Sequence, residues 1–235
     1  MKNGLFITGT GTGVGKTVVS AMICRRLRSA GYDTVFYKPV QTGASGKIAP
    51  DCEFVQKATD DQVATGNTYL FKLPSSPHLA AEKEKTNVSI SRIKTDYAKL
   101  SKAHDFVIVE GAGGLSVPLN RKGTLISDIP RGLKLNTLIV SNAGLGAINH
   151  VSLTANFAKS KGIYVSAVIL ISDKRKPSEI EKDNCRILKQ MLKLESVCLV
   201  KSVKGVCTTK MKAGRIGEAM RTFPTTESIK GWIDE

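Results

Sequence analysis

The nine residues GTGTGVGKT, Gly9 to Thr17, decide how the rest of the chain is interpreted. They follow a short apolar run, Gly4 to Thr8, and precede apolar residues at helical spacing that continue as far as Gly31. This pattern predicts a strand, a glycine-rich turn and a helix. The backbone N–H groups of such a turn and the positive end of the helix together form a binding site for phosphate groups.

Two side chains at the end of this loop suit the same chemistry. Lys16 supplies an ammonium group and Thr17 a hydroxyl group, which match a phosphate and a Mg²⁺ ion. A strict phosphate-loop pattern requires glycine where this chain has Thr10, although the GKT end is intact. The alternative, a turn that only permits tight packing, is disfavoured by the strand before it and the helix after it. The other candidate nucleotide contacts in the loop are Gly13, Val14, Gly15 and Val18.

The same alternation of strand and helix recurs along the chain. Apolar, β-branched runs occur at 34–37, 106–109, 137–140 and 165–171, and helical patterns follow several of them. This arrangement is typical of a parallel sheet covered by helices on both faces. We therefore expect one α/β domain over residues 1–235, with a P-loop NTPase-like fold and a mostly parallel sheet. The weakly patterned stretch 42–91 is interpreted as an ordered excursion over the site.

Composition limits the class of protein. The 235 residues include no apolar run near the ~20 residues that span a bilayer. The five cysteines form no CxxC pair, which predicts reduced thiols and a cytoplasmic location. The formal charge of +15 raises the possibility of a nucleic-acid binder, but the lysines are spread along the chain with few aromatic residues among them. We favour a solvated basic surface that attracts anionic small molecules, with neither nucleic acid nor membrane as partner.

Two further strand ends carry charged residues. Lys38 follows the strand at 34–37 and precedes a proline, which holds it extended and places a second ammonium near the phosphate loop. Glu110 follows the strand at 106–109 and enters a glycine-rich turn, as expected of a carboxylate linked to Mg²⁺. A solvent-exposed lysine and a salt-bridged glutamate are the alternatives. Asp51 is a weaker candidate for a second acidic ligand.

Five segments together resemble one family, the dethiobiotin synthetases, in order and at compatible spacing. The segments are TGTGTGVGKT (8–17), YKPVQTG (37–43), SSPH (75–78), VEGAGGLSVPL (109–119) and GLGAINH (144–150). The resemblance implies an ATP- and Mg²⁺-dependent enzyme of biotin biosynthesis. In that family, CO₂ converts the diamine 7,8-diaminononanoate to a carbamate, ATP phosphorylates the carbamate, and the second amine displaces phosphate to close a ureido ring.

The resemblance also implies roles for individual residues. Lys16 and Lys38 match the catalytic lysines of the family, which stabilise charge on the transferring phosphoryl group. The residues that match its Mg²⁺ ligands are Thr17, Asp51 and Glu110. The residues that match its diamine and carbamate contacts are Thr12, Lys38 and Thr42. The residues that would line the nucleotide site by their backbone are Gly111, Ala112 and Gly113.

The family is a homodimer in which the neighbouring subunit receives the substrate carboxylate at the start of a helix. The segment GLGAINH suits that task, because glycines and free N–H groups after a strand form an anion site. An ordinary turn between strand and helix is the alternative. The resemblance therefore implies a substrate site at the subunit interface, with contacts from Leu145, Gly146, Ala147 and Asn149.

The chain also departs from the family pattern. Gly11 and Gly13 stand where acidic residues are common, so the contribution of those carboxylates is absent or comes from elsewhere. Ser172 and Asp173 lie where the family has an asparagine and an aspartate that read the adenine, which predicts a looser nucleotide preference. Beyond Asp173 the resemblance fades.

Three other classes compete with this interpretation. Partition and septum-site ATPases, which bind DNA or membranes, carry a signature lysine where this chain has Gly11. Amide-forming synthases of the cobyrinic acid type normally add a glutamine-hydrolysing domain, for which the expected single domain leaves no length. A binding module without catalysis is the third class; it predicts salt-sensitive DNA retention without diamine-stimulated ATP hydrolysis.

Overall fold

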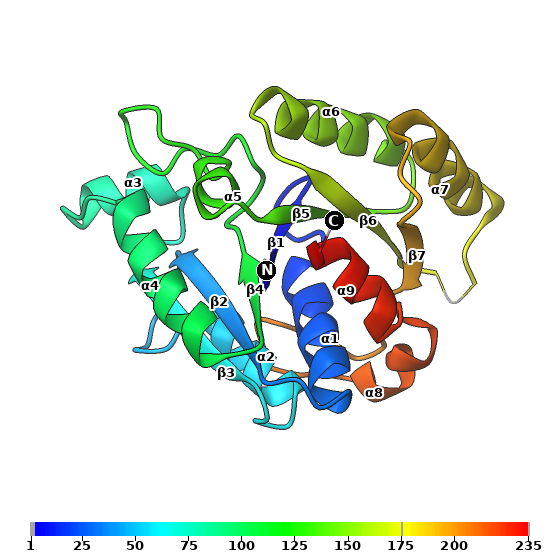
Figure 1. Ribbon diagram of the computed structural model, residues 1–235, viewed down its shortest axis with the longest axis horizontal. Coiled ribbons are helices and arrows are strands. Elements are labelled where there is room, and N and C mark those ends of the chain that lie inside the picture. The colour runs from blue at the N-terminus through cyan, green and yellow to red at the C-terminus, as the bar shows by residue number, and fades with distance from the viewer. Residues whose placement is uncertain (1–2, 175, 235) are drawn as a thin grey trace.

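The computed structural model describes residues 3–174 and 176–234, and its centre is a seven-stranded sheet (Figure 1). The strand order is β3-β2-β4-β1-β5-β6-β7, and every neighbouring pair is parallel. The strands are β1 (Gly4–Gly9), β2 (Thr34–Gln41), β3 (Ala64–Leu70), β4 (Phe106–Glu110), β5 (Asn136–Asn142), β6 (Val165–Ser172) and β7 (Val197–Lys201). A parallel sheet brings all the carboxyl ends of its strands to one edge, where ligands of such folds bind.

Helices cover both faces of this sheet, as the sequence predicts (Figure 1). One face carries α1 (Lys16–Ser29), α2 (Pro50–Ala58), α8 (Ile216–Ala219) and α9 (Thr226–Asp234), followed after α8 by a 3₁₀ turn, Met220–Thr222. The other face carries α3 (Pro77–Lys83), α4 (Ile90–Ala103), α5 (Asp128–Leu133), α6 (Ala147–Ser160) and α7 (Glu179–Leu192). No helix in the described part of the chain has the length and apolar character needed to cross a membrane.

The central strands are apolar on both sides because both faces are covered. Leu5 and Ile7 of β1 pack towards α1 and α9, whereas Phe6 packs on the opposite face. β1 is hydrogen-bonded to β4 on one side and to β5 on the other. The strand that leads into the phosphate loop therefore lies at the middle of the sheet, with a strand on each side and side-chain packing on each face.

The structure differs from the sequence-based expectation in β2, in the stretch 42–91 and at the edge formed by β7. β2 continues through Lys38 and Pro39 to Gln41, so Lys38 lies within a strand rather than beyond its end. Proline is tolerated because β2 pairs with β4 only as far as Tyr37 and pairs with β3 alone after that. The stretch 42–91 contains α2, α3 and the edge strand β3, and β7 adds a strand at the opposite edge.

The C-terminal helix α9 closes the core over β1 and β5. Trp232 is 1% exposed and packs in the same cluster as Leu5 and Ile7. The backbone carbonyl groups of Trp232 and Ile233 accept hydrogen bonds from the buried amide of Asn136 at 3.1 and 3.2 Å. α9 is therefore part of the hydrophobic core and not an appendage.

We expect Trp232→Ala to lower the free energy of unfolding by about 3–5 kcal/mol, because it removes a fully buried aromatic side chain and leaves a cavity. Urea titration followed by far-UV circular dichroism measures the change. Ile180→Ala is the matched control, since that side chain is 51% exposed, and it should change stability by less than about 0.5 kcal/mol. Equal losses for the two variants would contradict the proposed packing of α9.

Candidate active site

A cleft of about 970 Å³ opens at the carboxyl ends of the strands. Its floor is the phosphate loop between β1 and α1, and its charged side chains are Lys16, Lys38, Asp51 and Glu110, with Asp173 and Lys201 further along. Three segments that are distant in sequence, β1–α1, β2 and β4, thus bring their ends to one site. This is the edge at which the sequence places the chemistry.

The phosphate loop adopts the conformation that its glycines permit. Gly13 and Gly15 have φ angles of 77° and 95°, which side chains with a Cβ rarely adopt. The Lys16 Nζ reaches back across the loop and donates to the carbonyl oxygen of Gly11 at 2.8 Å. Burial is the largest effect on this ammonium and lowers its pKa, with Glu110 opposing that change and Lys38 adding to it. The Lys16 ammonium is hydrogen-bonded to a neutral carbonyl group rather than to a carboxylate, which leaves its charge available to an anionic ligand.

Lys38 and Glu110 form the centre of the site. The Lys38 Nζ lies 2.8 Å from Glu110 Oε1 and 2.6 Å from Asp51 Oδ2, and it also donates to the carbonyl oxygen of Gly111 at 3.1 Å. Both Lys38 and Glu110 are almost fully buried, at 3% and 1% exposed. Asn67 of β3 donates to the carbonyl oxygen of Lys38 at 2.6 Å and fixes the backbone behind it.

The charge of Lys38 is set by two opposing effects. Burial, the largest, lowers its pKa, but attraction and hydrogen bonding to Glu110 and Asp51 together outweigh it, so the pKa is raised well above the ordinary value. With these two carboxylates in place, the raised pKa favours the ammonium form of Lys38. An ammonium held at this place suits electrostatic stabilisation of a developing negative charge.

Helix α1 supplies two hydroxyl groups to the same carboxylate. The Thr17 Oγ1 donates to Glu110 Oε1 at 3.0 Å, and the Ser20 Oγ donates to Glu110 Oε2 at 2.8 Å. Residues three apart lie on one face of a helix, which explains why both hydroxyls reach one group. Ser20 was not among the residues singled out from the sequence. Its spacing from Thr17 was the available signal, and it becomes meaningful only once Glu110 is known to lie against α1.

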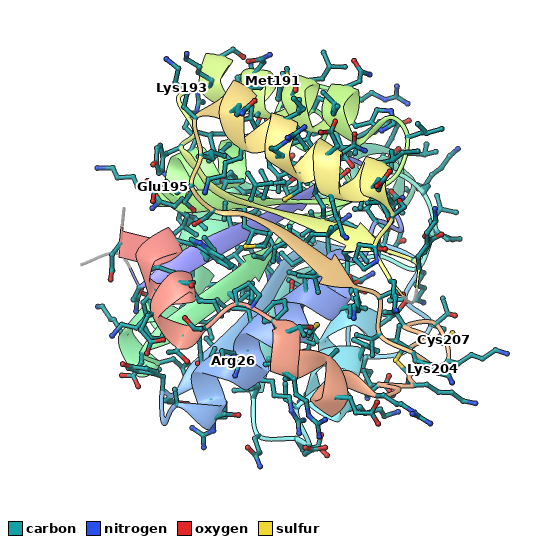
Figure 2. The ribbon with its side chains drawn as sticks, turned by 90° about the vertical axis from the view of Figure 1, so that its right-hand side faces the viewer. Arg26, Met191, Lys193, Glu195, Lys204 and Cys207 are labelled. Atoms are coloured by element: carbon teal, nitrogen blue, oxygen red, sulfur yellow. The ribbon has the colours of Figure 1, made fainter. Side chains whose placement is uncertain are left out.

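The far wall of the cleft comes from two further parts of the chain, one within the stretch 42–91 that was expected to lie over the site and one beyond Asp173 that was not singled out. Residues 74–77 form one side, and residues 200–203 and 206–209, at the end of β7 and beyond it, form another. Figure 2 shows Lys204 and Cys207 on this segment after β7. The signal in the sequence was the short apolar run of β7, whose carboxyl end had to reach the same edge of the sheet.

Most of the residues singled out from the sequence line this one cleft. They are Thr12, Gly13, Val14, Gly15, Lys16, Thr17, Val18, Lys38, Thr42, Asp51, Glu110, Ala112, Gly113 and Asp173. Gly111 takes part through its carbonyl oxygen, which accepts from Lys38. The phosphate loop and the two charged strand ends thus lie together, as expected for the carboxyl ends of parallel strands.

Five of the residues lie elsewhere. Leu145, Gly146, Ala147 and Asn149 are at the start of α6 and do not line the cleft of their own chain. Ser172 is fully buried, because alternation along β6 turns Ile171 towards the cleft and Ser172 away from it. The Ser172 hydroxyl is hydrogen-bonded to the Glu181 carboxylate and to the backbone N–H of Lys174. Its predicted role in reading the base stays a prediction, and this geometry does not favour it.

The oxygen atoms around Lys38 define what the site is able to bind. Thr17, Asp51 and Glu110 present one hydroxyl and two carboxylates within reach of the Lys38 ammonium. In the described part of the chain, no group of three or more His, Cys, Asp or Glu side chains is arranged to hold a metal ion. A site with two carboxylates suits a hard cation that shares its remaining coordination with phosphate oxygens, as Mg²⁺ does.

Comparison with known proteins identifies the family. The profile of an AAA domain matches residues 3–208. The protein named ATP-dependent dethiobiotin synthetase BioD from Clostridium perfringens (strain ATCC 13124) is 35% identical, with 88% of this chain and 93% of that protein covered. Proteins with the same name from Anoxybacillus flavithermus and Clostridium kluyveri are 40% and 33% identical. They cover 80% and 98% of this chain and 86% and 98% of their own length.

Solved structures with low sequence identity share the fold. A chain of the MinC:MinD cell division protein complex of Aquifex aeolicus has a TM-score of 0.58 at 16% identity, with 98% of this chain and 93% of that chain covered. The ParA family ATPase of Chlorobium tepidum has a TM-score of 0.57 at 11% identity, over 100% and 98%. These likenesses confirm the P-loop NTPase-like fold. Together with the relatives and the converging strand ends, they lead to one conclusion: the chain belongs to the ATP-dependent dethiobiotin synthetases.

Proposed function

We propose that the chain closes the ureido ring of dethiobiotin from 7,8-diaminononanoate, CO₂ and ATP. One amine adds to CO₂ with loss of a proton and forms a carbamate. A carbamate oxygen takes the γ-phosphoryl group of ATP and releases ADP. The second amine then attacks the carbamate carbon and loses a proton, and the bond between that carbon and the phosphate oxygen breaks with release of inorganic phosphate. The observation that carries this proposal is the buried cluster of Lys38, Glu110 and Asp51 beside the phosphate loop.

The charges of this cluster suit the meeting of two anions. Lys16 and Lys38 balance Asp51 and Glu110, so the four side chains have no net charge before a ligand binds. A carbamate and a γ-phosphate repel each other, and two fixed ammonium groups offset that repulsion without reorganisation. Lys16 turns from the Gly11 carbonyl to the phosphates. Lys38 turns from its two carboxylates to the reacting phosphoryl group and the carbamate.

The residues present fit Mg²⁺. Thr17, Asp51 and Glu110 would hold the ion, and its positive charge would neutralise phosphate oxygens. The same carboxylate oxygens now accept from Lys38, at 2.6 and 2.8 Å. A cation held there would draw on the same two carboxylates, and Lys38 would then offer its ammonium to the substrates. Asp51 and Glu110 would thus hold Lys38 in place before the ligands bind.

The remaining lining residues are assigned by position. Gly13, Gly15 and Val18 belong to the turn and helix start that would surround the phosphates; Ala112 and Gly113 also line the cleft, and Gly111 accepts from Lys38. Thr12 and Thr42 line the same cleft and have hydroxyl groups. We assign them to the diamine and its carbamate. Asp173, which lines the cleft where Ser172 does not, is the better candidate for a base contact.

We also propose a homodimer with the substrate carboxylate held at the start of the partner's α6. Leu145 is 90% exposed and Leu153, further along α6, is 61% exposed, which is unusual for large apolar side chains. α6 is 14 residues long, begins after Gly146 with a φ of 86°, and has no acidic residue in its first turn. The residues at the start of α6 do not line the cleft of their own chain, which is compatible with a contribution to a partner. A cytoplasmic location is part of the proposal, supported by five free thiols.

Lys16→Ala and Lys38→Ala should each lower turnover by at least about 100- to 1,000-fold, because each removes a charge that stabilises the transferring phosphoryl group. The measurement is ADP release that depends on both diaminononanoate and bicarbonate. Lys57→Ala is the matched control, since Lys57 is on nearby α2, is 49% exposed and pairs only with Glu53 among the described residues. Full turnover in Lys38→Ala would remove that residue from the mechanism.

The affinity for ATP should fall on the alkaline side as Lys16 loses its proton. Burial, its largest effect, lowers the pKa of Lys16, so the ammonium is lost at a lower pH than in a free lysine. Only the protonated form attracts phosphates, and affinity therefore decreases as pH rises through this pKa. Calorimetric titration with ATP between pH 7 and pH 10 measures the trend. Lys16→Ala should bind ATP weakly at every pH in this range. If the affinity of that variant for ATP still decreased as pH rises, a group other than Lys16 would be responsible for the decrease.

Leu145→Asp should shift the protein from dimer to monomer in sedimentation experiments and raise the KM for the diamine more than the KM for ATP. The reason is that a carboxylate at the start of α6 both repels the substrate carboxylate and disfavours an apolar contact. Met191→Asp is the control, on a side chain that is 56% exposed near the end of α7 (Figure 2). A Leu145→Asp protein that stays dimeric with unchanged kinetics would place the interface elsewhere.

A further inference from the structure

The hydroxyl of Ser20 is directed at the rear of the catalytic carboxylate. Ser20 lies one helical turn after Thr17 on α1 and is fully buried. Its Oγ donates to Glu110 Oε2 at 2.8 Å. Ser20 does not line the cleft, so it contacts neither nucleotide nor substrate directly. Any effect on the reaction must pass through Glu110.

The two oxygen atoms of Glu110 have different tasks. Oε1 faces the cleft and accepts from Thr17 at 3.0 Å and from Lys38 at 2.8 Å. Within residues 3–174 and 176–234, the hydrogen bonds to Oε2 come from Ser20 alone. The last torsion of a glutamate is broad and roughly two-fold, so a carboxylate held at only one oxygen is free to turn. Ser20 supplies the second fixed point.

The surroundings of Oε2 offer little else. Cys24, one turn further along α1, is fully buried, and burial followed by the nearby Glu110 charge raises the pKa of its thiol. The thiol therefore stays neutral and contributes at most a weak donor. Glu110 is 1% exposed, so with Ser20 removed its Oε2 would be left buried without its hydroxyl partner.

We propose that Ser20 is a positioning residue whose hydroxyl fixes the plane of the Glu110 carboxylate, so that Oε1 is presented to the metal ion and to Lys38. The proposal rests on the proposed function, since the metal role of Glu110 belongs to it. Groups that hydrogen-bond to metal ligands typically change metal affinity or activity about 10- to 100-fold when removed. Without Ser20, the carboxylate turns to pair more closely with Lys38, which competes with the metal.

The test measures metal binding separately from turnover. Mn²⁺ replaces Mg²⁺ as the probe, and electron paramagnetic resonance counts free Mn²⁺ during titration of the protein with ADP present. Ser20→Ala should weaken Mn²⁺ binding about 10- to 100-fold, while ADP binding without metal changes less than about two-fold. Ser166→Ala is the matched control: Ser166 is 2% exposed on β6, and its hydroxyl has no hydrogen-bond partner among the residues that the structure describes. It should leave Mn²⁺ binding unchanged.

Two conservative variants separate positioning from a loss of structure. Ser20→Thr keeps the hydroxyl and should restore Mn²⁺ binding to within about three-fold of the unmodified protein. Ser20→Cys keeps the size but weakens the donor, and should lie between Ser20→Thr and Ser20→Ala. Thermal unfolding shows whether Ser20→Ala folds. If it does not, the Mn²⁺ affinities of Ser20→Cys and Ser20→Thr are compared instead to test the role of the hydroxyl.

The outcomes also separate this proposal from the proposed function. Unchanged Mn²⁺ affinity in a folded Ser20→Ala protein, or in Ser20→Cys, would overturn the role of Ser20 whatever the turnover. Failure of Ser20→Thr to restore binding would overturn it as well, because the hydroxyl would then not be the cause. Weakened Mn²⁺ binding in Ser20→Ala, with no diamine-dependent ADP release by the unmodified protein, would support Ser20 and reject the reaction.

Discussion

The buried carboxylate of Glu110 is the constraint on which the site depends. At 1% exposed, it cannot be left unpaired without a large loss of stability. Its partners come from two different elements, Lys38 of β2 and the hydroxyls of Thr17 and Ser20 on α1. Satisfying one carboxylate thereby fixes the strand, the helix and the phosphate loop at the start of that helix. The positions of Lys16 and Lys38 therefore follow from the pairing of Glu110.

This arrangement separates two uses of positive charge. Inside the cleft, Lys16 and Lys38 are balanced by Asp51 and Glu110; burial lowers the pKa of Lys16, whereas for Lys38 the two carboxylates outweigh burial and raise the pKa. The formal charge of +15 therefore resides almost wholly on the surface. A basic surface raises the local concentration of anionic ligands and is screened by salt, whereas the buried pairs are screened much less. A higher ionic strength should therefore slow the association of the nucleotide and leave the rate of the chemical step nearly unchanged.

The sequence was sufficient for the central sheet and its charged ends, and the reason is physical. β1, β4, β5 and β6 are covered on both faces, so their apolar runs are continuous and easily recognised. The second half of β2 and the edge strand β3 are interrupted by lysine, proline, glycine and asparagine, which have low strand propensity. They form strands because their neighbours supply partners. Lys38 thus lies in the cleft with the phosphate loop, but within a strand rather than beyond its end.

The parts of the cleft that were not anticipated share a different property. Phosphate and metal chemistry needs particular side chains at fixed spacing, so Lys16, Thr17 and Glu110 are visible in the sequence. A wall such as 200–209 needs only a strand that ends at the right edge and a chain that folds back over the cleft. Many sequences satisfy that requirement, which explains why this wall is hard to recognise in the sequence, although the family profile extends to residue 208. Ser20 is an intermediate case: its side chain is specific, but its meaning depends on a carboxylate 90 residues away. Residues that act through another group become recognisable only when the fold has brought that group to them.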